Sequence, residues 1–451
     1  MSESSSGQRE PNRSLGLLDA TMIGMGAMIG AGIFVLTGLA AETAGPAAIL
    51  AFALNGVVTS FTALSYAELA SSIPKNGGGY AYVNEVFSDV VSFLMGWMLW
   101  FAYMIAGALY ALGFGSNFIE FFHIYDITLP GGHTLYALGV VAVFVALNAV
   151  SASASGGAET VVTVIKIIIL IVFSAFGASA ASAGEFTPFF TQGEAAILSA
   201  MGLTFIAFEG YDLIATVTEE VKNPRKNIPR AIFISLGATL VIYLVVVFVA
   251  IGTLGAERLG AQGETGIAVA AGSFMPEFPL IGGGDSVIAF GAVFSTISAL
   301  NAVILASSRV AFSMGREGQL VKKVGQLHHR YGTPFWAIVA SSAVMLLSVM
   351  YIPIQQVGNL SSLFFLVSFV LVNASVIRLR RERPDMSRPY EIPFYPVPPI
   401  LGIVLNLVLG FFIDPVTWML GTAWLLFGVL VYWLLQTPRV TVDRLKEGVN
   451  R

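Results

Sequence analysis

Residues 24–34 read Gly-Met-Gly-Ala-Met-Ile-Gly-Ala-Gly-Ile-Phe and lie in the middle of the first long apolar segment of the chain. Each of the four glycines in this stretch weakens a helix by about 1 kcal/mol relative to alanine. A break inside the bilayer leaves backbone N–H and C=O groups unpaired, which is tolerated only where they face protein or a water-filled cavity. The stretch therefore predicts an interrupted transmembrane helix with a ligand site built from backbone, a feature typical of transporters.

The composition is that of a membrane protein. Of the 451 residues, 56% are hydrophobic and only 11% are charged, whereas a soluble domain has about 25% charged residues. The chain has no cysteine, and its four histidines lie in or beside predicted loops, which argues against disulfides and metal sites. The sequence shows no nucleophile–base pair, so we do not expect an enzyme. We expect an all-α membrane protein without cofactor, metal or nucleic acid partner. The sequence leaves the oligomeric state open.

Twelve apolar segments come close to the ~20 residues that a helix needs to cross a bilayer. We expect transmembrane helices at residues 15–40, 46–71, 90–119, 133–150, 159–181, 194–217, 230–254, 282–312, 334–352, 358–378, 395–413 and 415–435. Polar tails at residues 1–14 and 437–451 flank them.

The positive charges lie on one side of this topology. Nearly all of the 23 lysines and arginines fall in the two tails or in the loops that follow even-numbered segments, and the opposite loops carry mainly acidic residues. Loops rich in lysine and arginine stay in the cytoplasm. We therefore expect both termini to be cytoplasmic and the chain to be a multi-pass protein of the plasma membrane.

The sixth segment contains a second interruption. Residues 205–212 read Phe-Ile-Ala-Phe-Glu-Gly-Tyr-Asp, again in the middle of an apolar segment. Five helices per half would invert the second half relative to the first, and interrupted segments at matching positions of inverted halves indicate a mid-membrane site in secondary transporters. We therefore expect a first repeat at 15–181, a second repeat at 194–390 and two additional helices within 391–436.

The glycine-rich loop at residues 73–80 lacks the Gly-Lys-Ser/Thr sequence of a phosphate-binding loop. No other part of the sequence indicates a nucleotide-binding domain. Transport is therefore expected to be driven by an ion gradient or by exchange.

Taken together, several ordered motifs resemble the amino acid–polyamine–organocation superfamily. They include residues 26–34, 74–82, 208–224, 298–318 and 388–390. The similarity is greatest to prokaryotic amino acid permeases, including those like cationic amino acid transporters, and runs from Ser14 to about Pro399. It implies a LeuT-type fold of five plus five inverted helices with broken helices one and six, and alternating access.

The resemblance also implies a site for the head group of an amino acid. The N–H groups of Ala31 and Gly32 would bind the carboxylate, and the carbonyl groups of Met28, Ile206 and Glu209 would bind the amine. The alternative is that the glycines only allow close helix packing. The other candidate substrate-binding residues are Ile29, Gly30, Phe205, Phe208 and Gly210, with the two phenylalanines placed to form a lid.

Lys166 is the one basic residue deep within a predicted segment. A cation at mid-membrane is costly, by roughly 2.5–3.5 kcal/mol on insertion scales, so it is expected to have a function, unless its side chain snorkels to the membrane surface. Burial disfavours the charged form of a lysine, which makes Lys166 a candidate proton carrier. Proton-coupled members of the superfamily have a lysine here, and the expected partners are first-segment carbonyls near Met25 and the hydroxyl of Ser295 or Ser298.

Glu209 places a carboxyl group within the second break, where many relatives have an apolar residue. It is a candidate counter-ion for a cationic substrate group or a second proton site, and the alternative is a cap for free N–H groups of the second half-helix. Asp212, one turn further on, is read as structural or gating. Trp97, Trp100 and Tyr103 are more simply explained by packing than by the site, and Glu68 by ion pairing at the cytoplasmic end.

We conclude from the sequence that the chain is a secondary transporter of amino acids, with protons, a small-molecule amino acid and the lipid bilayer as its partners. An exchanger of amino acids or polyamines is an alternative on the same fold. A sensor that binds amino acids without transporting them is a second alternative.

Overall fold

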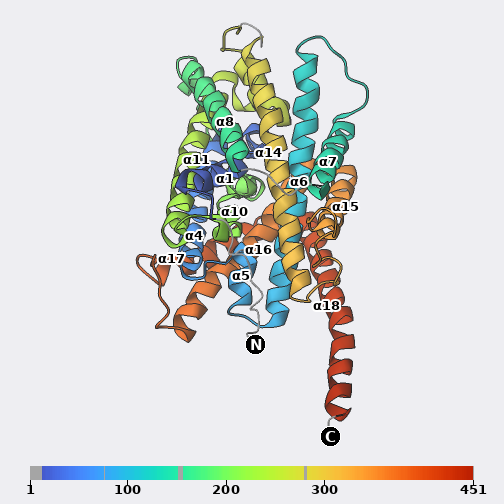
Figure 1. The fold of residues 1–451 in the computed structure, drawn as a ribbon. Coiled ribbons are helices and arrows are strands. Elements are labelled where there is room, and N and C mark those ends of the chain that lie inside the picture. The colour runs from blue at the N-terminus through green and yellow to red at the C-terminus, as the bar shows by residue number, and fades with distance from the viewer. Residues whose placement is uncertain (1–12, 76, 151–155, 279–281, 450–451) are drawn as a thin grey trace.

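A computed structural model describes residues 13–75, 77–150, 156–278 and 282–449 of the chain. Most of the tail expected at 1–14, and residue 76 of the glycine-rich loop, lie outside these residues. Within the described ranges the protein is a bundle of helices without strands (Figure 1). Ten helical stretches in this described part of the chain are long and apolar enough to cross a membrane, which agrees with a multi-pass membrane protein.

The first half of the chain begins with a helix in pieces. The elements are α1 (Leu17–Met28), α2 (Ala31–Phe34), α3 (Leu36–Ala44), η1 (Gly45–Ala47), α4 (Ala48–Ser72), α5 (Gly78–Asn84), α6 (Asp89–His123), α7 (His133–Val150), α8 (Gly156–Gly177) and η2 (Ala183–Phe186). The first predicted segment, 15–40, is thus divided among α1, α2 and α3 rather than forming one helix.

The second half also begins with a helix in pieces. Its elements are α9 (Ala196–Thr204), η3 (Phe205–Phe208), α10 (Tyr211–Thr216), η4 (Thr218–Glu220), α11 (Pro224–Leu254), α12 (Ala256–Ala261), η5 (Gly263–Thr265), α13 (Gly266–Gly272), α14 (Gly284–Arg316), α15 (Phe335–Tyr351), α16 (Ile354–Glu382), α17 (Val397–Phe411) and α18 (Pro415–Val449). The segments predicted at 334–352 and 395–413 are the two shorter apolar helices, α15 and α17. The tail predicted at 437–451 continues α18 as a helix up to Val449.

The broken helices occupy the interior of the bundle. α1 packs against α8, α10 and α11, while α14 packs along α6. Every described residue from Gly24 to Ala41 is buried, as is every residue from Met201 to Thr218. The two interruptions predicted from sequence therefore lie in the core of the protein and not on its lipid-facing surface.

One end of the bundle is basic. Glu85 forms ion pairs with Lys75 (3.0 Å) and Arg383 (2.7 Å), and the neighbouring Asn84 donates to Glu317, just after α14 (2.7 Å). These contacts bring the loops after α4, α14 and α16 together. We call this the basic end, and α18 extends beyond the bundle there (Figure 1).

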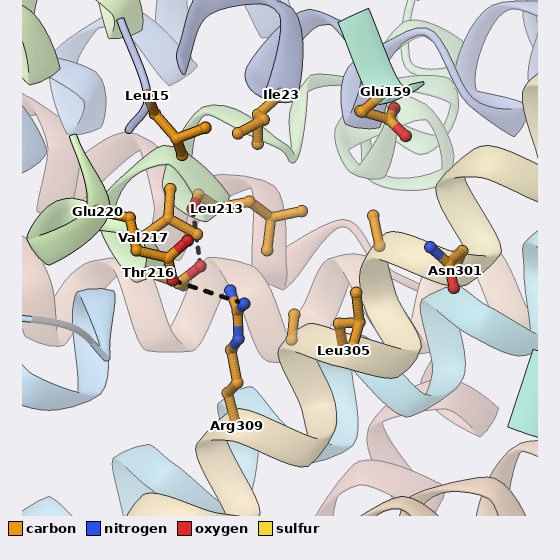
Figure 2. Close-up of a pocket in the computed structure, with 12 residues that line it drawn as sticks. Leu15, Ile23, Glu159, Leu213, Thr216, Val217, Glu220, Asn301, Leu305 and Arg309 are labelled. Carbon is orange, nitrogen blue, oxygen red and sulfur yellow. Dashed lines mark hydrogen bonds and ion pairs between the residues drawn. The ribbon is translucent and has the colours of Figure 1, made fainter. Parts of the chain in front are cut away.

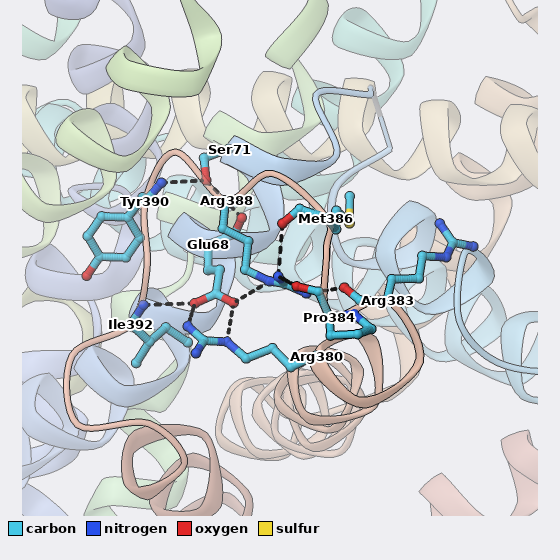
Figure 3. A network of polar contacts seen from close by, with 9 residues as sticks. All are labelled: Glu68, Ser71, Arg380, Arg383, Pro384, Met386, Arg388, Tyr390 and Ile392. Atoms are coloured by element: carbon cyan, nitrogen blue, oxygen red, sulfur yellow. Dashed lines mark hydrogen bonds and ion pairs between the residues drawn. The ribbon is translucent and has the colours of Figure 1, made fainter.

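A buried carboxylate ties the α16–α17 linker to α4 at the same end (Figure 3). Arg380 of α16 donates to both oxygens of Glu68, at 2.8 and 2.6 Å, and the N–H of Ile392 in the linker donates a third hydrogen bond at 2.8 Å. The guanidinium of Arg388 lies 3.7 Å away. Glu68 is 3% exposed, and it joins this ion-pair network, as predicted, rather than the site between the broken helices.

Candidate functional site

The two breaks lie against one another. A Cβ atom added to Gly210 would lie 2.7 Å from the backbone nitrogen of Met28, and one added to Gly32 would lie 2.8 Å from the Cα of Ala207. Gly210 also has a φ of +143°, a conformation that side chains other than glycine rarely adopt. Glycine at these positions allows the two backbones to meet.

Tyr243 of α11 connects the breaks. Its hydroxyl donates to the carbonyl of Met28 at the end of α1 and lies 2.9 Å from the carbonyl of Ala207 in η3. Its ring packs against Phe208, with centroids 5.3 Å apart. Tyr243 lies in a long apolar segment without an interruption, so sequence reasoning did not select it.

Other polar groups hold the first break open. The hydroxyl of Ser295 on α14 donates to the carbonyl of Ile29 and lies 3.3 Å from that of Gly30. The N–H groups of Ala31 and Gly32 belong to the first turn of α2, where a helix supplies no acceptor of its own. Carbonyl and N–H groups of the backbone therefore meet at this point in the core.

The second break is fixed in part by backbone and side-chain contacts. The N–H of Ile206 donates to the hydroxyl of Ser362 (3.2 Å), and its carbonyl accepts from the N–H of Glu209 (3.1 Å). Phe205 is fully buried against Phe369, with centroids 6.1 Å apart. The second lid candidate, Phe208, is likewise fully buried.

Glu209 has a different environment from its neighbour Asp212. The carboxylate of Asp212 accepts from the hydroxyl of Tyr103 and from the N–H of Gly210 (2.8 Å). Glu209 is 4% exposed, and neither carboxyl oxygen has a hydrogen-bond partner among the described residues. The capping role considered for Glu209 is therefore filled by Asp212, and Glu209 is left with an unused carboxyl group in the core.

Two buried tyrosine hydroxyls accompany Glu209. Those of Tyr66 on α4 and Tyr211 on α10 also lack hydrogen-bond partners within the described ranges. Their rings pack edge to face, with centroids 5.5 Å apart, and Tyr211 follows Glu209 by two residues. The second break thus contains a cluster of buried polar groups without hydrogen-bond partners among the described residues.

Lys166 of α8 is completely buried and points at the first broken helix. Its Nζ donates to the carbonyl of Gly26 (3.0 Å) and to the hydroxyl of Ser298 on α14 (3.1 Å). The structure thus shows no snorkelling. Ser295, the other expected partner, contacts the backbone of the break instead.

Ser298 has a second partner that the sequence analysis did not select. Its hydroxyl donates to Oε1 of Glu159, at 2.7 Å. Glu159 precedes Lys166 by seven residues, about two helical turns, so the two side chains share one face of α8. The seven-residue spacing between Glu159 and Lys166 is visible in the sequence and could have identified Glu159 as a neighbour of Lys166.

Two aromatic candidates on α6 face away from the breaks. The indole N–H of Trp97 donates to the carbonyl of Trp424 on α18 (3.1 Å), and that of Trp100 donates to Ser341 on α15 (2.8 Å). The packing explanation therefore holds for both. Tyr103 differs from them through its contact with Asp212.

A cavity of about 110 Å³ lies between α1, α8, α10 and α14 (Figure 2). Glu159 lines one side of it, and Glu220 and Arg309 line the other, where their side chains pair at 3.8 Å. Because α14 continues from Arg309 to the basic end, the cavity lies between the first break and that end. Within the described part of the chain, no cluster of three or more histidine, aspartate or glutamate side chains could hold a metal ion.

Buried paired breaks in an apolar helical bundle are typical of membrane transporters. The family model described as "Amino acid permease" matches residues 15–435. The chain belongs to this family of amino acid transporters, as the superfamily resemblance predicted.

Named relatives extend over almost the whole chain. The branched-chain amino acid permease BcaP of Bacillus subtilis (strain 168) is 30% identical, covering 95% of this chain and 94% of that protein. The methylthioribose transporter of the same organism is 29% identical over 94% and 93%. The inner membrane transport protein YbaT of Escherichia coli (strain K12) is 31% identical over 82% and 85%.

Proposed function

We propose that the protein is a proton-coupled secondary transporter that takes up amino acids across the plasma membrane by alternating access. The basic end faces the cytoplasm in this proposal, because positively charged loops remain on that side. The paired breaks support twelve transmembrane helices in a LeuT-type arrangement, with two inverted repeats of five helices and two additional helices.

The backbone of the first break is suited to the group that all amino acids share. The N–H groups of Ala31 and Gly32 bind the carboxylate, and the carbonyl of Met28 binds the ammonium together with carbonyls of the second break at Ile206 and Glu209. Ile29 and Gly30 form the turn, which Ser295 supports. Phe205, Phe208 and Gly210 form the opposite wall.

Glu209 is proposed to bind a cationic group of the substrate. A carboxyl group buried without hydrogen bonds requires a proton or a cation beside it, and Glu209 has no partner in the described structure. Glu209→Gln should therefore weaken transport of cationic amino acids more than that of neutral ones. Equal loss for both would assign Glu209 to proton handling instead.

Complete burial of Lys166 beside the first break is the observation that carries the coupling proposal. Its ammonium group links α8 to the carbonyl of Gly26 and to α14 through Ser298. An uncharged amine binds these acceptors more weakly than an ammonium does. Loss of the proton therefore loosens α1 from α8 and α14, which connects protonation to movement of the broken helix.

Uptake of labelled amino acids into proteoliposomes, with and without an imposed pH gradient, tests this function. Lys166→Ala should abolish proton-driven accumulation while leaving a folded protein. Lys75→Ala is the matched control, because Lys75 lies at the basic end and its side chain is 63% exposed. Proton-driven accumulation that survives in Lys166→Ala would refute the coupling.

The same assay separates the alternatives. An amino acid or polyamine exchanger would need substrate on the opposite side and would not respond to the pH gradient alone. A sensor would bind amino acids, seen as thermal stabilisation of the purified protein, without any flux.

A further inference from the structure

We propose that Ser298 and Glu159 form a proton relay between Lys166 and the cavity on the side of the basic end. This inference rests on the proposed proton coupling at Lys166 and adds the route by which the proton leaves. Glu159 and Ser298 would thereby be specific to the proton step, separate from the groups that bind the substrate.

The hydrogen bonds form a continuous path. Lys166 Nζ lies 3.1 Å from Ser298 Oγ, which lies 2.7 Å from Glu159 Oε1. The serine hydroxyl accepts from the ammonium and donates to the carboxylate, so both bonds are oriented for transfer in one direction. Two helical turns separate Lys166 from Glu159 on α8, and the serine from α14 spans the distance between them.

The transfer balances without any other reactant. The ammonium of Lys166 gives a proton to Ser298 Oγ as the hydroxyl proton of Ser298 passes to the carboxylate of Glu159. This leaves a neutral amine, an intact hydroxyl and a carboxylic acid. The acid then releases its proton to water, and rotation of the serine hydroxyl turns its proton back toward Glu159. Uptake of a new proton by Lys166 completes the cycle.

The cavity gives Glu159 a route to water. Glu159 lines the space of about 110 Å³ between α1, α8, α10 and α14, on the side opposite Glu220 and Arg309 (Figure 2). A water molecule needs roughly 10–15 Å³ of such space, so the cavity can hold several. Lys166, by contrast, is fully buried and is separated from this space by the other two groups.

Few charged groups surround the relay. On α1, Asp19 accepts from Thr160 next to Glu159 (3.4 Å), and α14 supplies Arg309 across the cavity. Residues 231–254 of α11, which also packs on α8, contain no charged side chain. Lys166 and Glu159 are therefore the two ionisable groups that share Ser298.

A purely structural role for Glu159 is the alternative to the relay, because its side chain packs closely against Gly26 of the first broken helix. A Cβ atom on Gly26 would lie 2.5 Å from its Oε1. A structural role would affect folding and every transport mode alike. A relay affects those modes in which a proton must be released.

Glu159→Gln distinguishes the two roles, because an amide can still accept the Ser298 hydrogen bond but cannot take up a proton. Two rates are measured in proteoliposomes: pH-gradient-driven accumulation, and exchange of labelled for unlabelled amino acid at equal pH, which needs no net proton release. We expect accumulation to fall at least about tenfold, with exchange and the thermal unfolding midpoint near wild type. Ser298→Ala should lose accumulation as well, but with a lower unfolding midpoint, because it also removes the hydrogen bond that links Lys166 to α14.

Glu220→Gln is the matched control, since Glu220 lines the same cavity without contacting Ser298, and it should resemble wild type. Wild-type accumulation in Glu159→Gln, or an equal loss of exchange and accumulation, would overturn the relay. Failure of the underlying function looks different: wild type and Lys166→Ala would then respond identically to the pH gradient.

Discussion

Gly210→Ala should severely reduce both stability and transport, because Gly210 connects the two halves of the second broken helix. Its φ of +143° is a conformation in which other residues are strained by about 1–3 kcal/mol. The new Cβ atom would lie 2.7 Å from the nitrogen of Met28 and 3.0 Å from the carbonyl oxygen of Gly24. These are backbone atoms that cannot rotate away, and overpacking of this kind costs about 1–3 kcal/mol more.

The expected destabilisation is therefore about 4 kcal/mol, a large part of the stability of a typical domain. Thermal unfolding of the purified protein and uptake in proteoliposomes measure it, and both should be severely reduced. Gly237→Ala is the matched control, since Gly237 is exposed on α11 and its added Cβ atom meets nothing within 4 Å. That variant should transport normally and be no less stable, because alanine favours a helix by about 1 kcal/mol.

A Gly210→Ala variant with a wild-type unfolding midpoint and wild-type uptake would refute the reasoning. It would mean that the two breaks do not need to approach as closely as the structure shows. Loss of uptake with unchanged stability would instead place the effect on movement of the broken helices rather than on their packing.

Three further predictions concern groups at the basic end and between the breaks. Glu68→Gln should lower the free energy of unfolding by about 3 kcal/mol, because Arg380 would lose its buried counter-charge; an unchanged unfolding midpoint would contradict this. The pKa of Glu85 is lowered, chiefly by its hydrogen bond from Arg383, so its contribution to stability is complete above the ordinary value of 4.5 and disappears as the pH falls through the lowered pKa. Glu85→Gln should accordingly lose less stability than wild type in melting curves recorded across that acidic range, and parallel curves would count against the ion pair. Tyr243→Phe should lower stability by about 1–3 kcal/mol through an unpaired buried carbonyl, and a bound amino acid should raise its unfolding midpoint more than that of wild type; an equal ligand-induced shift would disprove the role of the hydroxyl.

The helices and their interruptions could be predicted because they follow from local sequence. Length and apolar content identify spans, and glycines at 24–32 and at 210 mark where a helix cannot continue at low cost. Lys166 was also identifiable, because a charge in an apolar segment stands out without knowledge of its neighbours. Segment boundaries are less well determined than the presence of a helix: α11 begins at Pro224 rather than at the predicted residue 230, and α18 continues to Val449 beyond the predicted residue 435.

Contacts between helices could not be predicted in the same way. α6 is buried on nearly all sides, so its sequence does not show that Trp97 faces α18 and Trp100 faces α15, while Tyr103 faces the second break. Tyr243 resembles any aromatic residue of an apolar helix until the fold brings it to Met28. Which serine would contact Lys166 depended on the rotation of α14, and a helical turn separates the two candidates.

Tyr243, which lies between the two breaks, leaves the transporter without substrate short of one hydrogen-bond donor. A phenol offers a single donor proton, whereas two carbonyl oxygens, those of Met28 and Ala207, lie within its reach. One of them is therefore under-supplied whenever no substrate is present. In the proposed site an ammonium donor of the amino acid binds the carbonyl of Met28, which frees the phenol to donate to Ala207. Arrival of the amino acid would then complete a hydrogen-bond count that the protein by itself leaves short by one.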